Sequence, residues 1–359
     1  MDKSPSALRR CSPCRRNRCW RRLLAAGLTC TVLAVYACTP ELPRLSALIR
    51  RRSPPEPRPV SVLVWWEPFG RWRRQGDCRL LFNISRCNVT EDRGEYGRAQ
   101  AVLFHHRELL GEERGGLPAG ARPAGQRWVW MNFESPSHTP WLEGLGGVFN
   151  WTMSYKVSSD IFLPYGYLRA RAAEARAAVR LPRKSKLLAW VISNWNEEHA
   201  RVRYYRRLAR YLRVDVYGQA GLPLREDSVP RTVAPYKFYL AFENSQHEDY
   251  ITEKLWRNAL QAGAVPVVLG PSRANYERFI PRDAFIHVDD FSSPRKLARY
   301  LKFLDKNPPL YRRYFAWRKR YEVHVTSFWD EQFCAVCEAV RAAGEEVRTV
   351  PDLASWFED

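Results

Sequence analysis

The sequence predicts an α/β protein with two domains, each built around a parallel, doubly wound sheet. Short apolar runs recur from residue 60 onward, and in the second half amphipathic stretches of about 10–15 residues separate them. Several of these runs end directly in polar clusters, as strands of open α/β sheets do at their ligand-binding edge. The length of 359 residues allows two or three domains, and 45% apolar residues is typical of globular proteins.

The first half alternates short apolar runs with polar loops. The expected strands are residues 61–66, 100–104, 127–131, 148–154 and 160–164. Polar clusters follow two of them, at residues 105–108 and 132–136, where a ligand is expected. The Arg- and Ala-rich segment 169–186 is interpreted as a linker that contains the domain boundary.

The second half is a clearer series of alternating strands and helices. The expected strands are residues 186–192, 214–217, 237–242, 264–269 and 284–288. Asn196 is expected to cap a helix that runs to about residue 212. Thr252 is expected to cap a second helix, residues 253–262, which Gly263 ends, and Ser293 and Pro294 begin a third.

Two such domains that face a cleft form the GT-B arrangement of glycosyltransferases. Dehydrogenases and phosphorylases share this layout of alternating strands and helices. The sequence contains neither G-x-G-x-x-G nor G-x-x-x-x-G-K-[ST], so the two commonest glycine-rich phosphate loops are absent from it.

The net charge of +20 is unevenly distributed along the chain. Residues 1–58 contain 13 Lys and Arg against 3 Asp and Glu, and the remaining residues contain 45 against 35. The moderately basic body fits binding of an anionic donor. Charge alone also fits nucleic-acid binding, but the sequence lacks the zinc-finger, KH and RNP-type motifs of that class.

The N-terminal region predicts a membrane anchor. Residues 23–38 read LLAAGLTCTVLAVYAC and are uncharged, and seven arginines precede them. We expect a cytoplasmic tail at 1–22, a transmembrane signal anchor at 23–39 and a proline-rich stem at 40–59, with the body on the luminal side. A cleaved signal peptide is the alternative, which the long basic region makes less favourable.

Sequons and cysteines agree with a luminal body. Three N-glycosylation sequons begin at Asn83, Asn88 and Asn150. The body contains four cysteines, an even number that predicts two disulfides in an oxidising compartment. The cysteines are Cys78, Cys87, Cys334 and Cys337. Their spacing leaves three pairings open, and the C-x-x-C pair alone also fits a zinc half-site or a redox pair.

The densest polar stretch, FENSQHEDYITEK at residues 242–254, joins a strand to a helix. Helix N-termini bind phosphate through free N–H groups. Lys254 would add a full charge against a pyrophosphate, and Glu253 would face a sugar that develops oxocarbenium character. The alternative is that this stretch binds no ligand and is an ordinary capped helix with solvated charges.

The stretch YKFYLAFENSQHEDYITEKLWRNALQAGAVPVVLGPSRANYERFIP resembles the signature of the α1,3-fucosyltransferases, glycosyltransferase family ten. AVLFHHREL, WVWMNFESPSHTP, FNWTMSY, SDIFLPYG and AWVISNWNEEHARVRYY are also similar to blocks of these enzymes. The similarity runs in order from about residue 60 to 359. The resemblance is strongest to the vertebrate myeloid-type and brain-type members of the family, which build Lewis x.

This resemblance implies GDP-fucose as the donor and an inverting transfer. The implied donor-binding residues are Arg201, Asn244, Tyr250, Glu253 and Lys254. Glu134 is implied as the general base, with His106 and Glu108 as weaker candidates. An inverting transfer needs a base for the acceptor proton and positive groups for the leaving diphosphate. Glu134 has the alternative role of a structural hydrogen-bonding group before Pro136.

No Asp-x-Asp motif follows an apolar strand, so neither a metal site nor a cofactor is expected, while Mn stimulation stays open. The resemblance implies Golgi membrane localisation and acceptor glycans on glycoproteins and glycolipids, with no nucleic-acid partner. It also implies an acceptor-side domain at 60–180, a GDP-fucose-binding domain at 181–330, and a C-terminal segment, 331–359, that returns to the first domain.

Two further features rest on the resemblance. It implies crossed disulfides, Cys78–Cys334 and Cys87–Cys337, and a Cys334–Cys337 bridge would close a small ring. It also implies that His106 and Arg107 contribute to acceptor specificity, because strictly α1,3-specific members have Arg at the position of Arg107.

The competing interpretation is a non-catalytic glycan-binding protein on the same scaffold. The complete set of candidate residues favours the enzyme.

Overall fold

The computed structural model describes residues 58–70, 76–109, 116–172, 181–219 and 221–359, all of which belong to one unit, Pro57–Asp359. The predicted tail and anchor, and the stem up to residue 57, lie outside the described residues. No helix among the described residues combines the length and the apolar character that crossing a membrane requires.

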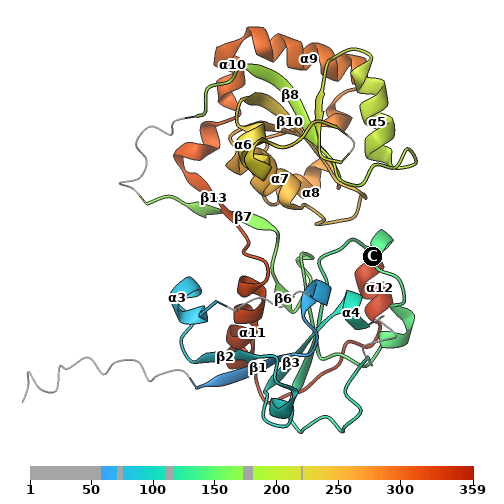
Figure 1. Cartoon of the computed structure of the whole chain (residues 1–359), viewed down its shortest axis with the longest axis vertical. Coiled ribbons are helices and arrows are strands. Elements are labelled where there is room, and N and C mark those ends of the chain that lie inside the picture. Colours follow the sequence, from blue (N-terminus) through green and yellow to red (C-terminus); the bar gives the residue numbers. More distant parts are fainter. Residues whose placement is uncertain (1–57, 71–75, 110–115, 173–180, 220) are drawn as a thin grey trace, which may run out of the picture. The chain divides into compact units, whose positions relative to one another are not determined.

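The first sheet has six parallel strands in the order β2-β1-β3-β4-β5-β6 (Figure 1). The strands are β1 (Val60–Val64), β2 (Cys87–Thr90), β3 (Ala101–His105), β4 (Arg127–Met131), β5 (Trp151–Ser154) and β6 (Ile161–Phe162). The interior strands β3 and β4 are buried along their whole length, which explains why they appear in the sequence as continuous apolar runs.

The second sheet has five parallel strands in the order β12-β11-β10-β8-β9. The strands are β8 (Lys186–Val191), β9 (Asp215–Tyr217), β10 (Tyr236–Phe242), β11 (Val265–Leu269) and β12 (Ile286–His287). Phe238 in the central strand pairs with Leu188 on one side and Val265 on the other. The predicted class, parallel α/β, is therefore confirmed for both sheets.

Both sheets have the same winding. Each begins with an interior strand, adds its second strand on one side, and places all later strands on the other side. The direction of winding therefore reverses between β1 and β3 and between β8 and β10. Ligands bind at such switch points, beyond the carboxyl ends of the strands. A two-stranded antiparallel sheet of β7 (Gly166–Ala170) and β13 (Tyr321–Val325) pairs two connecting segments.

Helices cover both faces of each sheet. The α-helices are α3 (Cys78–Phe82), α4 (His106–Leu109), α5 (Ala200–Ala209), α6 (Val229–Val233), α7 (Glu253–Leu255), α8 (Arg273–Glu277), α9 (Pro294–Lys306), α10 (Pro308–Arg313), α11 (Asp330–Ala342) and α12 (Leu353–Glu358). The 3-10 helices are η1 (Pro68–Gly70), η2 (Arg93–Glu95), η4 (Pro136–His138), η5 (Glu143–Leu145), η7 (Arg225–Asp227), η9 (Val288–Asp290) and η10 (Ala316–Lys319). A π-helix, η8 (Trp256–Gln261), directly follows α7.

Two predicted helices differ in detail. The helix expected to start at Asn196 starts at Ala200, because the side chain of Asn196 accepts a hydrogen bond from the Glu198 N–H within an earlier turn. The helix after Thr252 has the predicted cap, since Thr252 Oγ1 accepts from the Lys254 N–H. Its second half is the π-helix η8, and Gly263 follows it with a φ of 75°.

The C-terminal segment covers the first sheet. Disulfide bonds join Cys78 to Cys334 and Cys87 to Cys337, which is the crossed pairing. They fix α11 to the apolar face that contains β1 and β3. Leu353 and Phe357 of α12 are fully buried in the cluster on the opposite face. The last thirty residues therefore close both faces of a sheet formed by the first half of the body.

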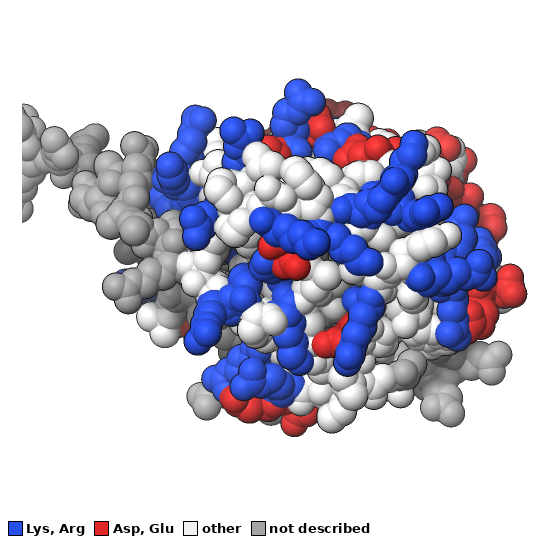
Figure 2. Space-filling model, turned by 90° about the horizontal axis from the view of Figure 1, so that it is seen from above, with Lys and Arg blue, Asp and Glu red and all other residues white. Residues whose placement is uncertain are grey.

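Basic side chains gather over the second half of the body. Residues 181–320 contain 27 Lys and Arg against 14 Asp and Glu. Figure 2 shows Lys and Arg side chains spread over the face seen from above, with few acidic groups between them. Helix α9 alone exposes Arg295, Lys296, Arg299, Lys302 and Lys306. The positive excess of the body thus belongs to the half that contains the candidate donor site.

Candidate active site

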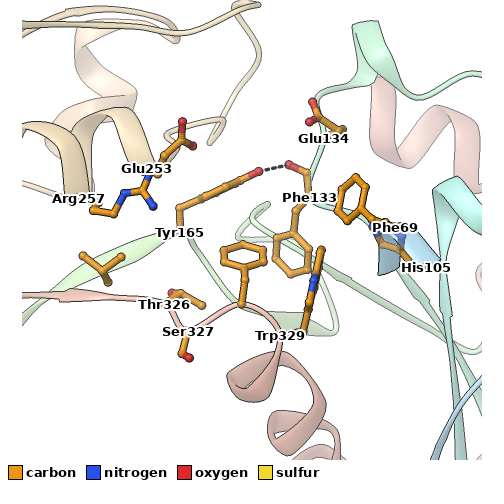
Figure 3. A pocket seen from close by; sticks show the side chains of 12 residues that line it. Phe69, His105, Phe133, Glu134, Tyr165, Glu253, Arg257, Thr326, Ser327 and Trp329 are labelled. Carbon is orange, nitrogen blue, oxygen red and sulfur yellow. Dashed lines mark hydrogen bonds between the residues drawn. The ribbon is translucent and has the colours of Figure 1, made fainter. Parts of the chain in front are cut away.

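A cavity of about 540 Å³ lies where segments that follow strands of both sheets meet (Figure 3). Its lining comes from the ends of β1, β3 and β4, from α7 and η8, and from the segment between β13 and α11. The lining residues are Phe69, His105, Phe133, Glu134, Tyr165, Glu253, Arg257, Val325, Thr326, Ser327, Phe328 and Trp329. Five of these residues are Phe, Tyr or Trp and four are His, Glu or Arg, a combination that suits a sugar whose apolar face stacks on rings.

Glu134 is the exposed carboxylate that the first sheet contributes to this cavity. It lies three residues beyond β4, and its N–H donates to the side chain of Asn132. The hydroxyl of Tyr250 donates to Glu134 Oε2 over 3.3 Å. Burial raises the pKa of Tyr250 well above its ordinary value, so this hydroxyl stays protonated and remains a donor. The carboxylate is thus oriented yet open to a ligand.

Lys254 is the centre of a charged network at the start of α7. Its Nζ lies 3.1 Å from Glu243 Oε2, 3.1 Å from Glu253 Oε1 and 2.9 Å from Thr252 Oγ1. Burial opposes the charged form of Lys254, but Glu243 and Glu253 outweigh it and raise the pKa of the lysine. Burial raises the pKa of Glu243, against the attraction of Lys254. Lys254 is therefore a permanent cation held between two carboxyl groups.

Arg201 lies near this network at the N-terminal end of α5. Its side chain is 5% exposed and donates from Nη2 to the Asn194 carbonyl, while Nε has no hydrogen-bond partner among the described residues. Burial lowers the pKa of Arg201, and Glu243 and Glu253 partly offset that effect. An unpaired buried N–H costs free energy unless a ligand satisfies it. Arg201 is thus suited to an anion at the β8–β10 switch point.

The loops of the two sheets are in direct contact beside these groups. Asn244 Oδ1 accepts from Ser245 Oγ, and Ser245 Oγ lies 2.6 Å from Ser135 Oγ in the loop after β4. Ser137 Oγ lies 2.7 Å from His247 Nε2. The segment that follows β10, which contains four of the candidate donor residues, is therefore joined directly to the loop that contains Glu134.

The paired histidines have different environments. His105 lines the cavity and forms a short contact with the Glu108 carboxylate. His106 is buried instead, and its ring nitrogens lie 2.9 Å from the Pro140 carbonyl and 3.1 Å from Trp130 Nε1. Burial lowers the pKa of His106 to about 4. His106, which the resemblance implied as an acceptor-specificity residue together with Arg107, thus lies behind the cavity wall and does not line the cavity.

Arg107 contacts the cavity indirectly. Its exposed guanidinium lies 5.0 Å from the centre of the Phe69 ring, within cation–π range. Phe69 has a left-handed backbone with φ 63°, and its N–H donates to Glu108 Oε1 over 2.8 Å. The sequence interpretation assigned no role to Phe69, Tyr165, Arg257 or Trp329, and it included His105 only within the polar cluster at residues 105–108. Nothing in their local sequence separates these residues from core or surface residues.

The three sequons differ in exposure. Asn83 and Asn88 are exposed. Asn150 is 1% exposed, its Oδ1 accepts from the Trp128 N–H, and its Nδ2 donates to the Arg348 carbonyl. A glycan on Asn150 would occupy Nδ2 and displace the chain at Arg348, so Asn83 and Asn88 are the more accessible of the three sequons, and glycosylation of the three sites stays a prediction.

Within the described part of the chain, no group of three or more His, Cys, Asp or Glu side chains is arranged to hold a metal ion. The adjacent Asp289 and Asp290 do not form such a group, and Asp290 is paired with Arg273.

Comparison with known proteins identifies the family. Residues 57–166 match the family model described as "Fucosyltransferase, N-terminal", and residues 181–356 match "Glycosyltransferase family 10 (fucosyltransferase) C-term". The chain belongs to glycosyltransferase family 10, the fucosyltransferases. It is therefore a glycosyltransferase.

Family 10 relatives resemble the chain over most of its length. Human alpha-(1,3)-fucosyltransferase 4 is 54% identical over 393 residues, which cover 95% of this chain and 73% of that protein. The cattle protein of the same name is 54% identical and is covered to 94%. Rat 4-galactosyl-N-acetylglucosaminide 3-alpha-L-fucosyltransferase 9 is 48% identical over 83% of this chain and 82% of its own length.

A solved structure shares the fold. The crystal structure of an alpha1,3-fucosyltransferase with GDP-fucose aligns with a TM-score of 0.52 at 16% identity, over 84% of this chain and 95% of that one. At this identity the likeness supports the two-sheet architecture alone. It agrees with the GT-B arrangement expected from the strand and helix order.

Proposed function

We propose that this family 10 enzyme transfers L-fucose from GDP-β-L-fucose to the 3-hydroxyl of GlcNAc in N-acetyllactosamine-type glycans, with inversion at the fucose anomeric carbon. The observation that carries the proposal is the position of Glu134 and Glu253 in one cavity, between the strand ends of the two sheets. The relatives named as alpha-(1,3)-fucosyltransferases and the structure named with GDP-fucose support the linkage and the donor.

On the donor side, Arg201 and Lys254 would bind the diphosphate. As the bond between fucose C1 and the β-phosphate oxygen breaks, negative charge grows on the departing GDP. Two fixed cations stabilise this charge without any reorganisation. Asn244, Tyr250 and Glu253 would hold the nucleotide sugar, and the Glu253 carboxylate would lie beside the positive charge that develops on the fucose ring.

On the acceptor side, Glu134 would take the proton of the attacking GlcNAc hydroxyl while the new C1–O bond forms. The proton ends on the carboxylate and the electron pair of the broken bond leaves with GDP, so one base suffices. The Tyr250 hydrogen bond to Glu134 would keep one carboxylate oxygen oriented and leave the other for the acceptor.

The aromatic wall suits the acceptor glycan. Phe69, Phe133, Phe328 and Trp329 line the same cavity as Glu134. Sugar rings stack their C–H faces on such side chains, and the Arg107 guanidinium supports the Phe69 ring from outside. We include Lewis x and sialyl Lewis x structures on glycoproteins and glycolipids as products.

The cellular setting is part of the same proposal. The enzyme would be a Golgi single-pass type II protein with anchor 23–39, stem 40–59 and a luminal body. The body would consist of an acceptor-side domain at 60–180, a GDP-fucose domain at 181–330 and the returning segment 331–359. The crossed disulfides require an oxidising compartment and support this assignment.

The full chain, purified in detergent, should be incubated with GDP-fucose and Galβ1-4GlcNAc. Release of GDP together with a product that carries fucose on O3 of GlcNAc is the expected result. Binding of the glycan without release of GDP would favour a non-catalytic glycan-binding protein on the same scaffold and would overturn the proposal.

A further inference from the structure

The cavity has two chemically different ends. Phe69, His105, Phe133 and Trp329 lie on the side of Glu134, whereas Arg257 lies beside Glu253, Thr326 and Ser327, with Tyr165 between the two groups (Figure 3). None of Arg201, Asn244 and Lys254 lines this cavity. Apart from Glu253, the candidate donor residues thus lie outside the cavity, so most of the cavity is available to the acceptor, and Arg257 is the arginine among its lining residues.

Arg257 reaches the cavity from an unusual backbone. It is the second residue of the π-helix η8, which follows α7 without a break. Trp256, Asn258, Ala259 and Leu260 around it are buried, so the neighbouring side chains hold the turn in place while Arg257 is exposed. Single π turns of this kind are rare and are frequent at functional sites, because they redirect one side chain of a helix.

The guanidinium of Arg257 retains free donors. Its Nε donates to Asn258 Oδ1 over 3.1 Å, and its two terminal nitrogens form no hydrogen bond or ion pair with the described residues. Burial raises the pKa of Glu253, but Lys254 outweighs it and lowers the pKa, with only a small contribution from Arg257, and Glu253 is already bonded to Lys254. The charge of Arg257 is thus not neutralised by a partner of its own.

Resting on the proposed function, we infer that Arg257 recognises an acidic group on the acceptor glycan, either the carboxylate of a sialic acid or a sulfate ester. A planar guanidinium matches both groups with two parallel hydrogen bonds. The cavity otherwise presents the carboxylates Glu134 and Glu253, which repel an anion. Without Arg257 the cavity would select against acidic acceptors, and with it an acidic group has one favoured position at the polar end.

The test compares acceptors rather than absolute rates. The full chain is assayed with Galβ1-4GlcNAc, its 3′-sialylated form and its 3′-sulfated form, and kcat/KM for each acidic acceptor is divided by the value for the neutral one. Arg257→Gln should lower this ratio by about tenfold or more, since one charge-assisted contact is lost. Arg257→Lys should retain part of it. The control Arg299→Gln, on the exposed face of α9, should leave the ratio unchanged.

If Arg257→Gln lowers the ratio for the sialylated acceptor alone, the group that Arg257 recognises is a carboxylate. If it lowers the ratio for the sulfated acceptor alone, the group is a sulfate ester. An unchanged ratio in both Arg257 variants overturns the inference while leaving the proposed function intact. A rise in the KM for GDP-fucose as large as the change in ratio also overturns it, because Arg257 would then be a donor contact. Binding can also be measured without turnover, with GDP present. Equal dissociation constants for the neutral and the acidic acceptors would overturn the inference.

Discussion

Tyr250 and Glu134 lie in loops that follow strands of different sheets, and the tyrosine hydroxyl donates a hydrogen bond to the Glu134 carboxylate across 3.3 Å. Tyr250 lies in the loop between β10 and α7, which also contains the candidate donor residues, and its side chain is 2% exposed. Glu134 lies beyond β4 and is exposed. The candidate base therefore accepts a hydrogen bond from the loop that contains the candidate donor residues.

Replacing Glu134 with Gln should lower kcat by about 10²- to 10⁴-fold, because the amide keeps the shape but cannot accept the acceptor proton. Binding of GDP-fucose, measured by calorimetry, should be retained. Glu143→Gln removes an exposed carboxylate from η5 and serves as the control. Turnover of the Glu134→Gln variant near that of the unmodified enzyme would exclude Glu134 as the base.

Replacing Lys254 with Met should weaken GDP-fucose binding by roughly ten- to a hundredfold, since it removes a cation from the diphosphate. It should also lower the free energy of unfolding by about 3–5 kcal/mol, because the buried Glu243 carboxylate loses its partner. Combining Lys254→Met with Glu243→Gln should recover most of the stability but not the donor affinity. Recovery of both would mean that Lys254 acts only through folding.

Arg107→Trp should increase fucosylation of Galβ1-3GlcNAc relative to Galβ1-4GlcNAc, because an indole in place of the cation changes the support of the Phe69 ring. The unmodified enzyme should use Galβ1-4GlcNAc efficiently and Galβ1-3GlcNAc hardly at all. The initial rates with the two acceptors give the answer directly. If the unmodified enzyme uses both equally well, the α1,3-only assignment is wrong.

Stability should fall on acidification because of His106. Its pKa in the folded protein is about 4, lowered by burial, whereas an unfolded histidine titrates near 6.5. The folded protein thus favours the neutral form of His106. The contribution of this histidine to the free energy of unfolding is complete above pH 6.5 and is lost as the pH falls toward 4. At pH 5 the loss is about 2 kcal/mol by linkage.

Urea unfolding at pH 7 and pH 5 measures this contribution. His106→Asn removes the titrating group, so the stability of this variant should fall less between the two pH values than that of the unmodified enzyme. His324→Asn, in the partly buried strand β13, is the comparison for a histidine in a different environment. An equal loss in the unmodified enzyme and the His106→Asn variant would show that other groups control acid sensitivity.

Glycopeptide mass spectrometry of the secreted or membrane-extracted protein should find glycans on Asn83 and Asn88 and none on Asn150. The reason is geometric, since Asn150 Nδ2 donates to the Arg348 carbonyl inside the fold. A fully glycosylated Asn150 in active enzyme would contradict the position of residues 344–350 against the first sheet.

The strands were predictable because parallel sheets covered on both faces are made from continuous apolar runs, as β10 and β11 show. The start of α5 was not, because Asn196 satisfies a nearby N–H in either arrangement and the sequence does not distinguish a turn from a cap. The π-helix η8 has no sequence signal of its own, since its residues are ordinary helix formers and its geometry depends on packing.

Four of the candidate donor residues, Asn244, Tyr250, Glu253 and Lys254, follow β10 in one short segment that resembles the family signature, whereas Arg201 lies apart in α5, and the donor roles of all five stay predictions. The acceptor wall was not predictable, since Phe69, His105 and Trp329 come from three distant segments and aromatic side chains are usually core. The neighbours His105 and His106 illustrate the same limit. Adjacent side chains at a strand end point in different directions, so one lines the cavity and the other is buried behind it.

The placement of α11 and α12 on the first sheet has a consequence for biosynthesis. A ribosome makes β1 to β6 long before it makes residues 330–359, whose side chains close the two apolar faces of that sheet. The half that carries Glu134 therefore cannot finish folding until residues 330–359 have been made, and until then its two apolar faces are uncovered. A premature stop that removes only the last few residues should lead to retention and degradation of the whole enzyme, although every residue of the cavity has already been made.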